Sequence, residues 1–121
     1  MGNHEAILDV VERYFESIYT GDVAGLRCVF HPAAQVTDNV RGPLRVRPVE
    51  EYILGVGSRE SPQARGERRT MHAIAVEVLD GVASVTARLD MLDQRYFNVL
   101  SLIKQDDQWI IVHKLFGDVA S

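Results

Sequence analysis

The stretch TMHAIAVEVLDGVASVTARLDML, residues 70–92, decides the fold. Asp80-Gly81 divides it into two runs that are rich in β-branched and apolar residues, and an Asp-Gly pair in that position is a strong signal for a β-hairpin. Two further runs of the same kind follow, each after a short polar separator. The second half of the chain therefore predicts a four-strand antiparallel meander over residues 70–79, 82–92, 95–104 and 109–116.

The first half of the chain has a helical pattern instead. Apolar residues recur every three or four positions after the N-terminus, and Gly21 is suited to end that helix. Asp22 is a good N-cap for a second helix, and Pro48 suits the first turn of a third. We expect helices over residues 4–20, 23–30 and 48–56, and a short strand pair over residues 34–38 and 44–46.

Helices gathered early and strands gathered late indicate an α+β fold rather than a parallel sheet of alternating strands and helices. The 121 residues fit one domain, residues 1–121, with a core of its own. The net charge of −4 and the pI near 5.5 argue against a nucleic-acid-binding protein. The one basic region, residues 41–69, also holds four glutamates, and we interpret it as solvated surface rather than an anion site.

The remaining composition excludes several classes of site. Cys28 is the single cysteine, so no intrachain disulfide can form, and its apolar neighbours predict a buried, inert thiol. No His, Asp and Glu spacing resembles a metal site, and no motif predicts a cofactor. The N-terminus has no basic flank with an apolar segment, and no apolar run approaches the length of a membrane span. We therefore expect a cytoplasmic protein.

Three motifs make the chain resemble the nuclear transport factor 2-like superfamily over nearly its whole length. They are a long first helix ending in Gly21-Asp22, a short helix ending in Phe30 before an Ala-x-Val strand, and a last strand WIIVHKLF over 109–116. Residues 97–116 are most similar to the "putative lumazine-binding" family, and the SnoaL-like polyketide cyclases are near relatives. The resemblance implies a cone-like, curved antiparallel sheet of about six strands and three helices that enclose a ligand cavity.

The chain also resembles the bacterial ketosteroid isomerases. The segments in register with that family are 10–14, Gly21-Asp22, Phe30, Ala34, Val36, Asp38 and 115–117. The resemblance places Asp38 at the position of the general base and Tyr14 at the position of a phenol that donates to the oxyanion. The second oxyanion donor of these enzymes is a protonated Asp, but Val99 stands at that position. Asn98 takes the position after a one-residue slip, and we expect it to donate only if a bulge turns it inward.

Asp38 is a candidate on chemical grounds as well. It ends the otherwise apolar face of Ala34 and Val36, and a desolvated carboxylate on an inward face is suited to take a proton. The alternative is an Asp at a strand end whose side chain bonds to the backbone of the turn. Tyr14 lies on the apolar stripe of the first helix. It is either an oxyanion donor or a core tyrosine whose hydroxyl reaches a backbone carbonyl or a water.

Lys114 is unusual in the last strand because it is a charged residue that alternates with the apolar residues Ile110, Val112 and Phe116 and so shares their face. If this face lines the cavity, the ammonium must meet a carboxylate or water, and Asp38 is the natural partner. Such an ion pair would weaken Asp38 as a base. Two alternatives also stay open for residues 82–92: an inward Arg88 that holds an anion, or an outward Arg88–Asp90 pair.

These patterns lead to three hypotheses for function. The first is a proton-transfer enzyme of isomerase or cyclase type that acts on a small apolar carbonyl compound, with Asp38 as base and Tyr14 as donor. The second is a non-catalytic domain that binds a small apolar or aromatic ligand, and the third is an interaction module. We expect a cavity of a few hundred Å³ or more, lined by Tyr14, Val36, Asp38, Tyr52, Lys114 and Phe116. The ligand-binding candidates are Val36, Tyr52, Asn98, Lys114 and Phe116.

The predicted meander also suggests a homodimer. Helices can cover only one face of the sheet, and residues 95–104 carry apolar side chains on both faces. An apolar sheet face left in water would be a large exposed patch, so we expect a symmetric partner to cover it.

Overall fold

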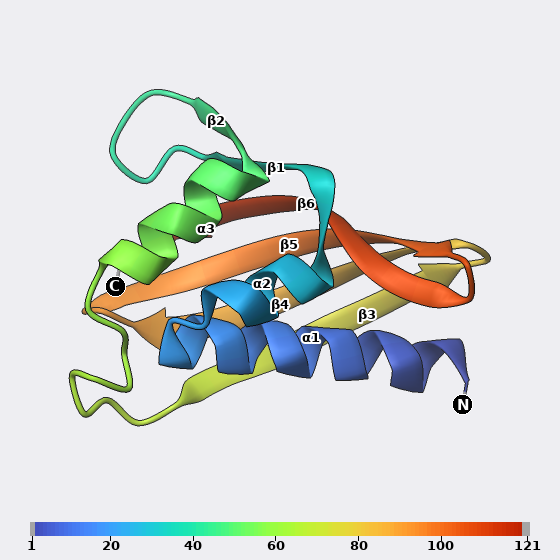
Figure 1. Ribbon diagram of the computed structural model, residues 1–121, viewed down its shortest axis with the longest axis horizontal. Helices are drawn as coiled ribbons and strands as arrows, with labels where there is room; N and C mark the ends of the chain where they lie inside the picture. Colours follow the sequence, from blue (N-terminus) through green and yellow to red (C-terminus); the bar gives the residue numbers. More distant parts are fainter. Residues whose placement is uncertain (1, 120–121) are drawn as a thin grey trace.

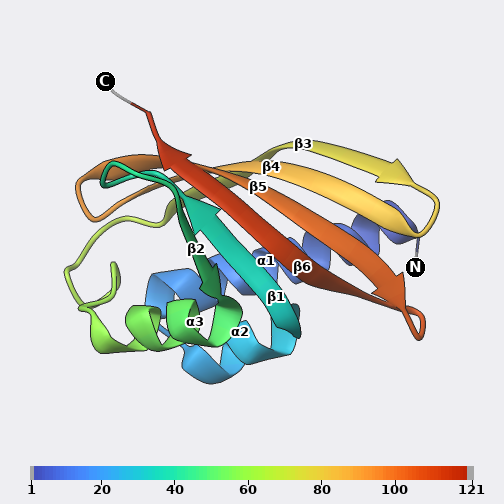
Figure 2. The same ribbon diagram turned by 90° about the horizontal axis from the view of Figure 1, so that it is seen from above.

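A curved sheet of six strands with three helices against one face makes up the computed structural model, which describes residues 2–119 (Figures 1 and 2). The elements run in the order α1 (Asn3–Thr20), α2 (Val23–Val29), β1 (Phe30–Asp38), β2 (Arg45–Pro48), α3 (Val49–Ser58), β3 (Thr70–Leu79), β4 (Val82–Met91), β5 (Gln94–Gln105) and β6 (Gln108–Asp118). The predicted α+β class and the predicted order of elements are confirmed.

The strands lie in the order β2-β1-β6-β5-β4-β3, and one pair departs from the prediction. The last four strands form the expected antiparallel meander, but β1 runs parallel to β6, with Val36 beside Lys114 and Asp38 beside Phe116. The expectation of a fully antiparallel sheet was therefore wrong. A hairpin forces antiparallel pairing between strands that follow one another in the chain, and no hairpin joins β1 to β6.

Tight turns set the register of the meander. Asp80 has φ 53° in the predicted Asp-Gly turn, and Leu92 and Asp93 have φ 52° and 65° in the next. That second turn begins one residue earlier than the sequence suggested. Positive φ at both central residues, as at Leu92 and Asp93, is the type I′ pattern, whose twist matches the flanking strands. The carboxylate of Glu67 accepts a hydrogen bond from the Leu92 N–H at 3.0 Å and supports this conformation.

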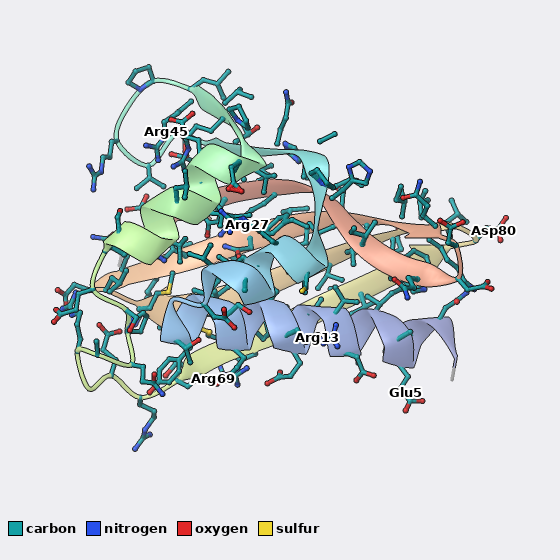
Figure 3. All side chains as sticks on the ribbon, viewed as in Figure 1. Glu5, Arg13, Arg27, Arg45, Arg69 and Asp80 are labelled. Carbon is teal, nitrogen blue, oxygen red and sulfur yellow. The ribbon has the colours of Figure 1, made fainter. Side chains whose placement is uncertain are left out.

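The helices pack against the sheet through the faces that the sequence predicted. Helix α1 buries Ile7, Val11 and Ile18, whereas its charged residues such as Glu5 and Arg13 point away from the sheet (Figure 3). Gly25 lets α2 approach α1 closely, because a Cβ there would lie 2.3 Å from Oγ of Ser17. Among residues 2–119, no helix combines the length and the apolar character needed to cross a membrane.

Cys28 is exposed, although its apolar neighbours predicted that it would be buried. Leu26 and Val29 face inward from α2, but Cys28 is exposed on the other side of this short helix. The expectation of a buried thiol was wrong because residues three apart, such as Leu26 and Val29, share a helix face, and the two residues between them do not.

The structure decides which face of β4 points inward. Val85, Ala87 and Leu89 are fully buried beneath the helices, and the polar residues alternate with them on the outer face. Arg88 pairs there with Asp90 at 3.2 Å. The outward alternative for Arg88 is therefore confirmed.

A β-bulge changes the inner face of β6. Ser101 lies opposite His113 and Leu102 lies opposite Ile111, so Val112 is an extra residue in this strand. Below the bulge Trp109 and Ile111 face inward, and beyond it Lys114 and Phe116 do. The predicted face of Ile110, Val112 and Lys114 was wrong, since simple alternation does not continue through a bulge.

Candidate functional site

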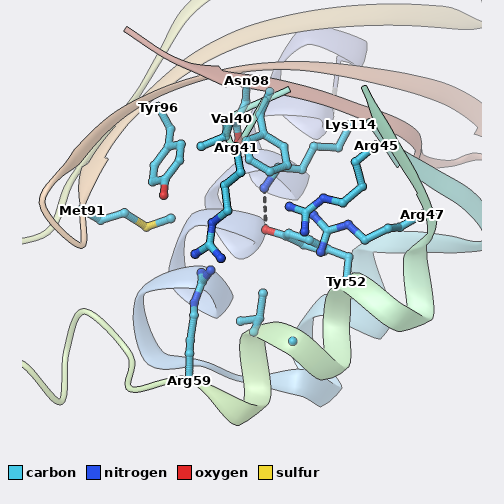
Figure 4. Close-up of a pocket in the computed structure, with 13 residues that line it drawn as sticks. Val40, Arg41, Arg45, Arg47, Tyr52, Arg59, Met91, Tyr96, Asn98 and Lys114 are labelled. Atoms are coloured by element: carbon cyan, nitrogen blue, oxygen red, sulfur yellow. Dashed lines mark hydrogen bonds between the residues drawn. The ribbon is translucent and has the colours of Figure 1, made fainter. Parts of the chain in front are cut away.

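A cavity of about 210 Å³ opens between α3, the segment that joins β1 to β2, and the inner face of the meander (Figure 4). Its volume is at the lower limit of the expected size. The cavity is lined by Val40, Arg41, Arg45, Arg47, Tyr52, Gly55, Val56, Arg59, Met91, Tyr96, Asn98, Lys114 and Phe116.

The predicted cavity residues divide into two groups. Tyr52, Asn98, Lys114 and Phe116 line the cavity, as expected. The other three lie behind its wall rather than in it, namely Tyr14, Val36 and Asp38, which are at most 2% exposed. They were assigned to the correct sheet or helix face, and two of them contact residues of the lining: Asp38 pairs with Arg45 and Arg47, and the Tyr14 ring centre is 5.1 Å from Nζ of Lys114.

Asp38 is held by two arginines and a backbone amide. Its Oδ2 lies 3.0 Å from Nη2 of Arg45 and 3.2 Å from Nη2 of Arg47, while Oδ1 accepts from the Val40 N–H at 3.1 Å. The bond to Val40 is the strand-end turn interaction that the sequence left open. The predicted pair between Asp38 and Lys114 is absent from the described residues, and that expectation was wrong.

The register of the β1–β2 hairpin explains the partners of Asp38. Arg45 lies directly opposite Asp38, and Arg47 lies opposite Val36. Residues that face each other across two strands point to the same side of the sheet, so both arginines turn inward with Asp38. The alternation Arg45-Val46-Arg47 places the two arginines on one face of β2. The sequence does not determine the pairing of β2 with β1, so it could not predict that this face carries Asp38 as well.

Lys114 lies in a cage of aromatic rings. Its Nζ is 5.1, 4.3 and 4.8 Å from the ring centres of Tyr14, Tyr52 and Phe116, and it donates a hydrogen bond to the Tyr52 hydroxyl. The side chain is 3% exposed, and among residues 2–119 no carboxylate oxygen lies within 4.0 Å of the amine. Burial, followed by the nearby guanidinium groups of Arg59 and Arg47, holds the pKa of Lys114 well below its usual value.

The Tyr14 hydroxyl is engaged within the protein. It donates a hydrogen bond to Oδ1 of Asn98, and both residues are fully buried. Asn98 faces inward by regular alternation of β5, opposite Phe116, and needs no bulge to do so. Burial raises the pKa of Tyr14 well above 10.0, and it raises the pKa of Tyr52 to about 12 against the opposing effect of Arg59 and Arg47. Both phenols are therefore protonated near neutral pH.

Four arginines of the basic region surround the open space. Arg41, Arg45, Arg47 and Arg59 line the cavity, and Figure 4 shows the side chains of Arg41 and Arg59 pointing toward one another. The interpretation of residues 41–69 as solvated surface holds for Arg41 and Arg45, which are exposed at the edge of the cavity, but is wrong for Arg47 and Arg59, which are partly buried. It also holds for Arg65, which is exposed and pairs with Glu67 and Asp93 at 3.1 and 3.0 Å.

One carboxylate, that of Asp38 behind the wall, is shared by two of the cationic groups that line the cavity, those of Arg45 and Arg47. No Asp or Glu belongs to the described lining. In the part of the chain that the structure describes, Nε of Arg47 and both Nε and Nη2 of Arg59 are buried without a hydrogen-bond partner. Unpaired buried guanidinium N–H groups are costly. An anion in the cavity would remove this cost, because it could accept from several of them at once.

Residues 2–119 contain no group of three or more His, Cys, Asp and Glu side chains placed to hold a metal ion. His72 and His113, the histidines that the predicted strands contain, lie on β3 and β6.

Comparison with known proteins agrees with this architecture. A crystal structure of an NTF-2-like protein of unknown function from Silicibacter pomeroyi DSS-3 is 20% identical, with a TM-score of 0.88, and the match covers 98% of this chain and 100% of that one. An NTF2-like protein of unknown function from Shewanella baltica OS155 is 19% identical, with a TM-score of 0.87 and coverage of 98% and 94%. An NTF2-like protein from Cytophaga hutchinsonii is 14% identical, with a TM-score of 0.82 and coverage of 98% and 100%.

These similarities establish the nuclear transport factor 2-like fold, and no curated protein matches the chain. The family described as "Putative lumazine-binding" matches residues 2–117. The chain therefore belongs to the "Putative lumazine-binding" family.

Proposed function

We propose that this protein binds a small organic anion that carries an apolar, preferably aromatic, body. The observation that carries the proposal is the lining of the cavity, which contains four arginines and Lys114 but no carboxylate among the described residues. Guanidinium groups match carboxylate, phosphate and sulfonate oxygens with paired hydrogen bonds. The unpartnered N–H groups of Arg47 and Arg59 supply the donors.

The rest of the lining selects for the body of the ligand. Tyr52, Tyr96 and Phe116 present aromatic surface, and Met91 and Val56 add aliphatic surface. A cavity of about 210 Å³ is smaller than the roughly 300–1,000 Å³ of sites for drug-sized molecules. A compound with one ring and one anionic group suits this space better than a steroid. The ligand proposed here is aromatic, as the sequence suggested, but it also carries a negative charge, which the sequence did not suggest.

Binding of such anions can be measured directly by isothermal titration calorimetry. Benzoate and phenyl phosphate should bind, and benzamide, which has the shape of benzoate without its charge, should bind at least about tenfold more weakly, because a hydrogen bond to a charged group contributes roughly 1.5–3 kcal/mol. Lumazine itself belongs in the panel as an uncharged heteroaromatic compound. Equal affinities for benzoate and benzamide would overturn the proposal.

A pair of variants connects binding to the cavity. Arg59→Gln removes a lining guanidinium, whereas Arg68→Gln makes the same charge change at an exposed residue outside the lining. We expect Arg59→Gln to weaken benzoate binding about tenfold or more and Arg68→Gln to leave it within about twofold, since exposed charges interact weakly through solvent. Equal effects of the two variants would show that benzoate binds elsewhere.

Proton transfer by Asp38 and Tyr14 is the second candidate function. Both residues are buried on the inner side of the fold beside the cavity wall, which favours it. Their partners argue against it, because Asp38 already accepts from two arginines and Tyr14 already donates to Asn98. A panel of β,γ-unsaturated ketones assayed with the wild type, Asp38→Asn and Tyr14→Phe tests this role. Equal activity in all three proteins would remove both residues from the mechanism.

We also propose that the outer face of the sheet binds a second copy of the chain. The helices cover the inner face, and the outer face carries apolar side chains from β5 and β6: Phe97, Val99, Ile103, Ile110, Val112 and Leu115. Leu115 is 44% exposed. A symmetric partner would remove this apolar area from water.

A further inference from the structure

Lys114 has no role that the fold explains. A buried amine usually pairs with a carboxylate, yet in residues 2–119 the carboxylate nearest in the fold, that of Asp38, is held by Arg45 and Arg47 instead. Lys114 lines the cavity, so its amine is in a position to contact a bound molecule. It lies beside Val36 in the sheet, with Nζ 4.3 Å from the ring centre of Tyr52.

We propose that Lys114 is a nucleophile that forms an imine with the carbonyl group of a small aldehyde or ketone acid bound in the cavity. This inference rests on the anion-binding function proposed above, because the arginines would hold the acid group while the carbonyl reaches the amine. The expected reactants are single-ring compounds that carry both an acid group and a carbonyl group.

The surroundings of Lys114 suit this chemistry. Only the neutral amine attacks a carbonyl, and lysines become nucleophilic in proteins when they are desolvated or placed beside other cations. Both conditions occur here. Lys114 is 3% exposed among three aromatic rings, and Arg47 and Arg59 line the same cavity. The pKa of Lys114 is accordingly lowered by burial first and by Arg59 and Arg47 next, while Asp38 acts in the opposite direction.

The proposed reaction balances without an oxidant or a reductant. The lone pair of Nζ adds to the carbonyl carbon, and the carbonyl π electrons move to oxygen, which takes up a proton as the nitrogen releases one. In the carbinolamine the nitrogen lone pair forms the C=N bond as the C–O bond breaks, and the leaving hydroxide takes the remaining N–H proton and departs as water. The Tyr52 hydroxyl, which accepts the hydrogen bond of Nζ, can relay the proton from nitrogen to oxygen.

The residues that would bind the acid group and the residue that would bind the carbonyl group narrow the class of substrate further. Arg45 is occupied by Asp38, and the unpartnered N–H groups belong to Arg59 and to Nε of Arg47. These donors and Lys114 line one cavity of about 210 Å³. A single aromatic ring that carries a carboxylate and an aldehyde on opposite sides therefore serves as a rigid probe.

The sequence provides an internal control, because its only lysines are Lys104 and Lys114. Lys104 is exposed, and its Nζ donates to Oδ1 of Asn3 at 3.1 Å. The wild-type protein is incubated at neutral pH with 4-formylbenzoate and sodium cyanoborohydride, which reduces an imine to a stable amine. Peptide mapping by mass spectrometry then compares the adduct at Lys114 with that at Lys104 and at the N-terminal amine.

We expect Lys114 to carry at least about tenfold more adduct than Lys104, because burial among the aromatic rings lowers the pKa of its amine and so raises the share of the neutral form. The uncharged isostere 4-formylbenzamide should label Lys114 at least about tenfold less, since it lacks the charge that the arginines hold. Lys114→Met should abolish the specific adduct, and Lys104→Met should leave it unchanged. Because the wild-type ratio between the two lysines is itself a test, the inference remains falsifiable if Lys114→Met does not fold.

The outcomes separate this inference from the proposed function. Benzoate binding by calorimetry without an adduct at Lys114 would overturn the nucleophilic role and leave anion binding intact. Equal labelling of Lys114 and Lys104 would overturn it as well. A third outcome is that 4-formylbenzoate and 4-formylbenzamide label Lys114 preferentially and to the same extent. That result would support Lys114 as a nucleophile and overturn the proposal that its substrate must be an anion.

Discussion

The guanidinium of Arg47 contacts the buried carboxylate of Asp38 through Nη2, at 3.2 Å, while its Nε is buried without a hydrogen-bond partner among the described residues. Arg47 is thus a structural ion-pair partner on one side and an unused donor on the other. This arrangement explains how one cavity can stay cationic although a carboxylate lies directly behind its wall. Asp38 supports the arginines, and its negative charge is already shared between two of them.

Replacement of Asp38 should therefore affect stability strongly. Asp38→Asn leaves Arg47, whose side chain is 14% exposed, without its counter-charge, and removal of one partner of a buried pair costs on the order of 3 kcal/mol. Urea unfolding followed by circular dichroism measures the change. Asp90→Asn is the control, because the Arg88–Asp90 pair is about one-third exposed and should contribute less than about 1 kcal/mol. Equal losses in the two variants would contradict the assignment of Asp38 as the buried anchor.

The Tyr14–Asn98 hydrogen bond should behave as a coupled buried pair. Tyr14→Phe leaves Oδ1 of Asn98 without its donor and should lower the free energy of unfolding by about 1–3 kcal/mol. Asn98→Leu in the Tyr14→Phe background should cost less than the sum of the single changes, because no polar group is then left unpaired. A double-mutant cycle in urea measures the coupling, and strict additivity would show that the two side chains do not interact.

Stability should rise with pH because of Lys114. The folded-state pKa of this amine lies below its unfolded value near 10.5, so between the two values the unfolded chain binds a proton that the folded chain does not. The free energy of unfolding should then increase with pH in that window, by up to about 1.4 kcal/mol per pH unit for one proton. It should not increase below the folded-state pKa, where both states are protonated.

Urea unfolding of the wild type and of Lys114→Met between about pH 7 and pH 9.5 tests this dependence. The raised pKa values of Tyr14 and Tyr52 affect stability only above about pH 10, since both phenols stay protonated in both states below it. Lys114→Met should lose the upward slope. A slope that is the same in both proteins would assign it to other groups.

The proposed dimer predicts a response to a single charge on the outer sheet face. Leu115→Glu places a carboxylate at a 44% exposed residue of β6 and should convert the protein to a monomer at micromolar concentration, because burying an unpaired charge is costly. Leu8→Glu, at a 36% exposed residue of α1, should leave the dimer intact. Light scattering coupled to size-exclusion chromatography gives the mass. A wild-type protein of monomer mass would remove the dimer proposal.

Much of the fold could be predicted because its signals are local. The Asp80-Gly81 turn, the helical spacing before Gly21 and the alternation of Asn98 with Leu100 each depend on residues close in sequence. These signals predicted the three helices, the six strands and the inner face of β1, while the inner faces of β4 and β5 were left open. They also identified Tyr52, Asn98, Lys114 and Phe116 as residues of the cavity.

The electrostatics of the cavity could not be predicted in the same way. Whether Asp38 meets Lys114 or an arginine depends on the β1–β2 register, and the inner face of β6 depends on the bulge at Val112. A shift of one residue in either place turns a side chain to the opposite face of the sheet. The sequence alone determined which segments form helices and strands, since local spacing sets them. Only the tertiary structure decided that Arg41, Arg45, Arg47 and Arg59 meet at one cavity, because long-range pairing brings their side chains together.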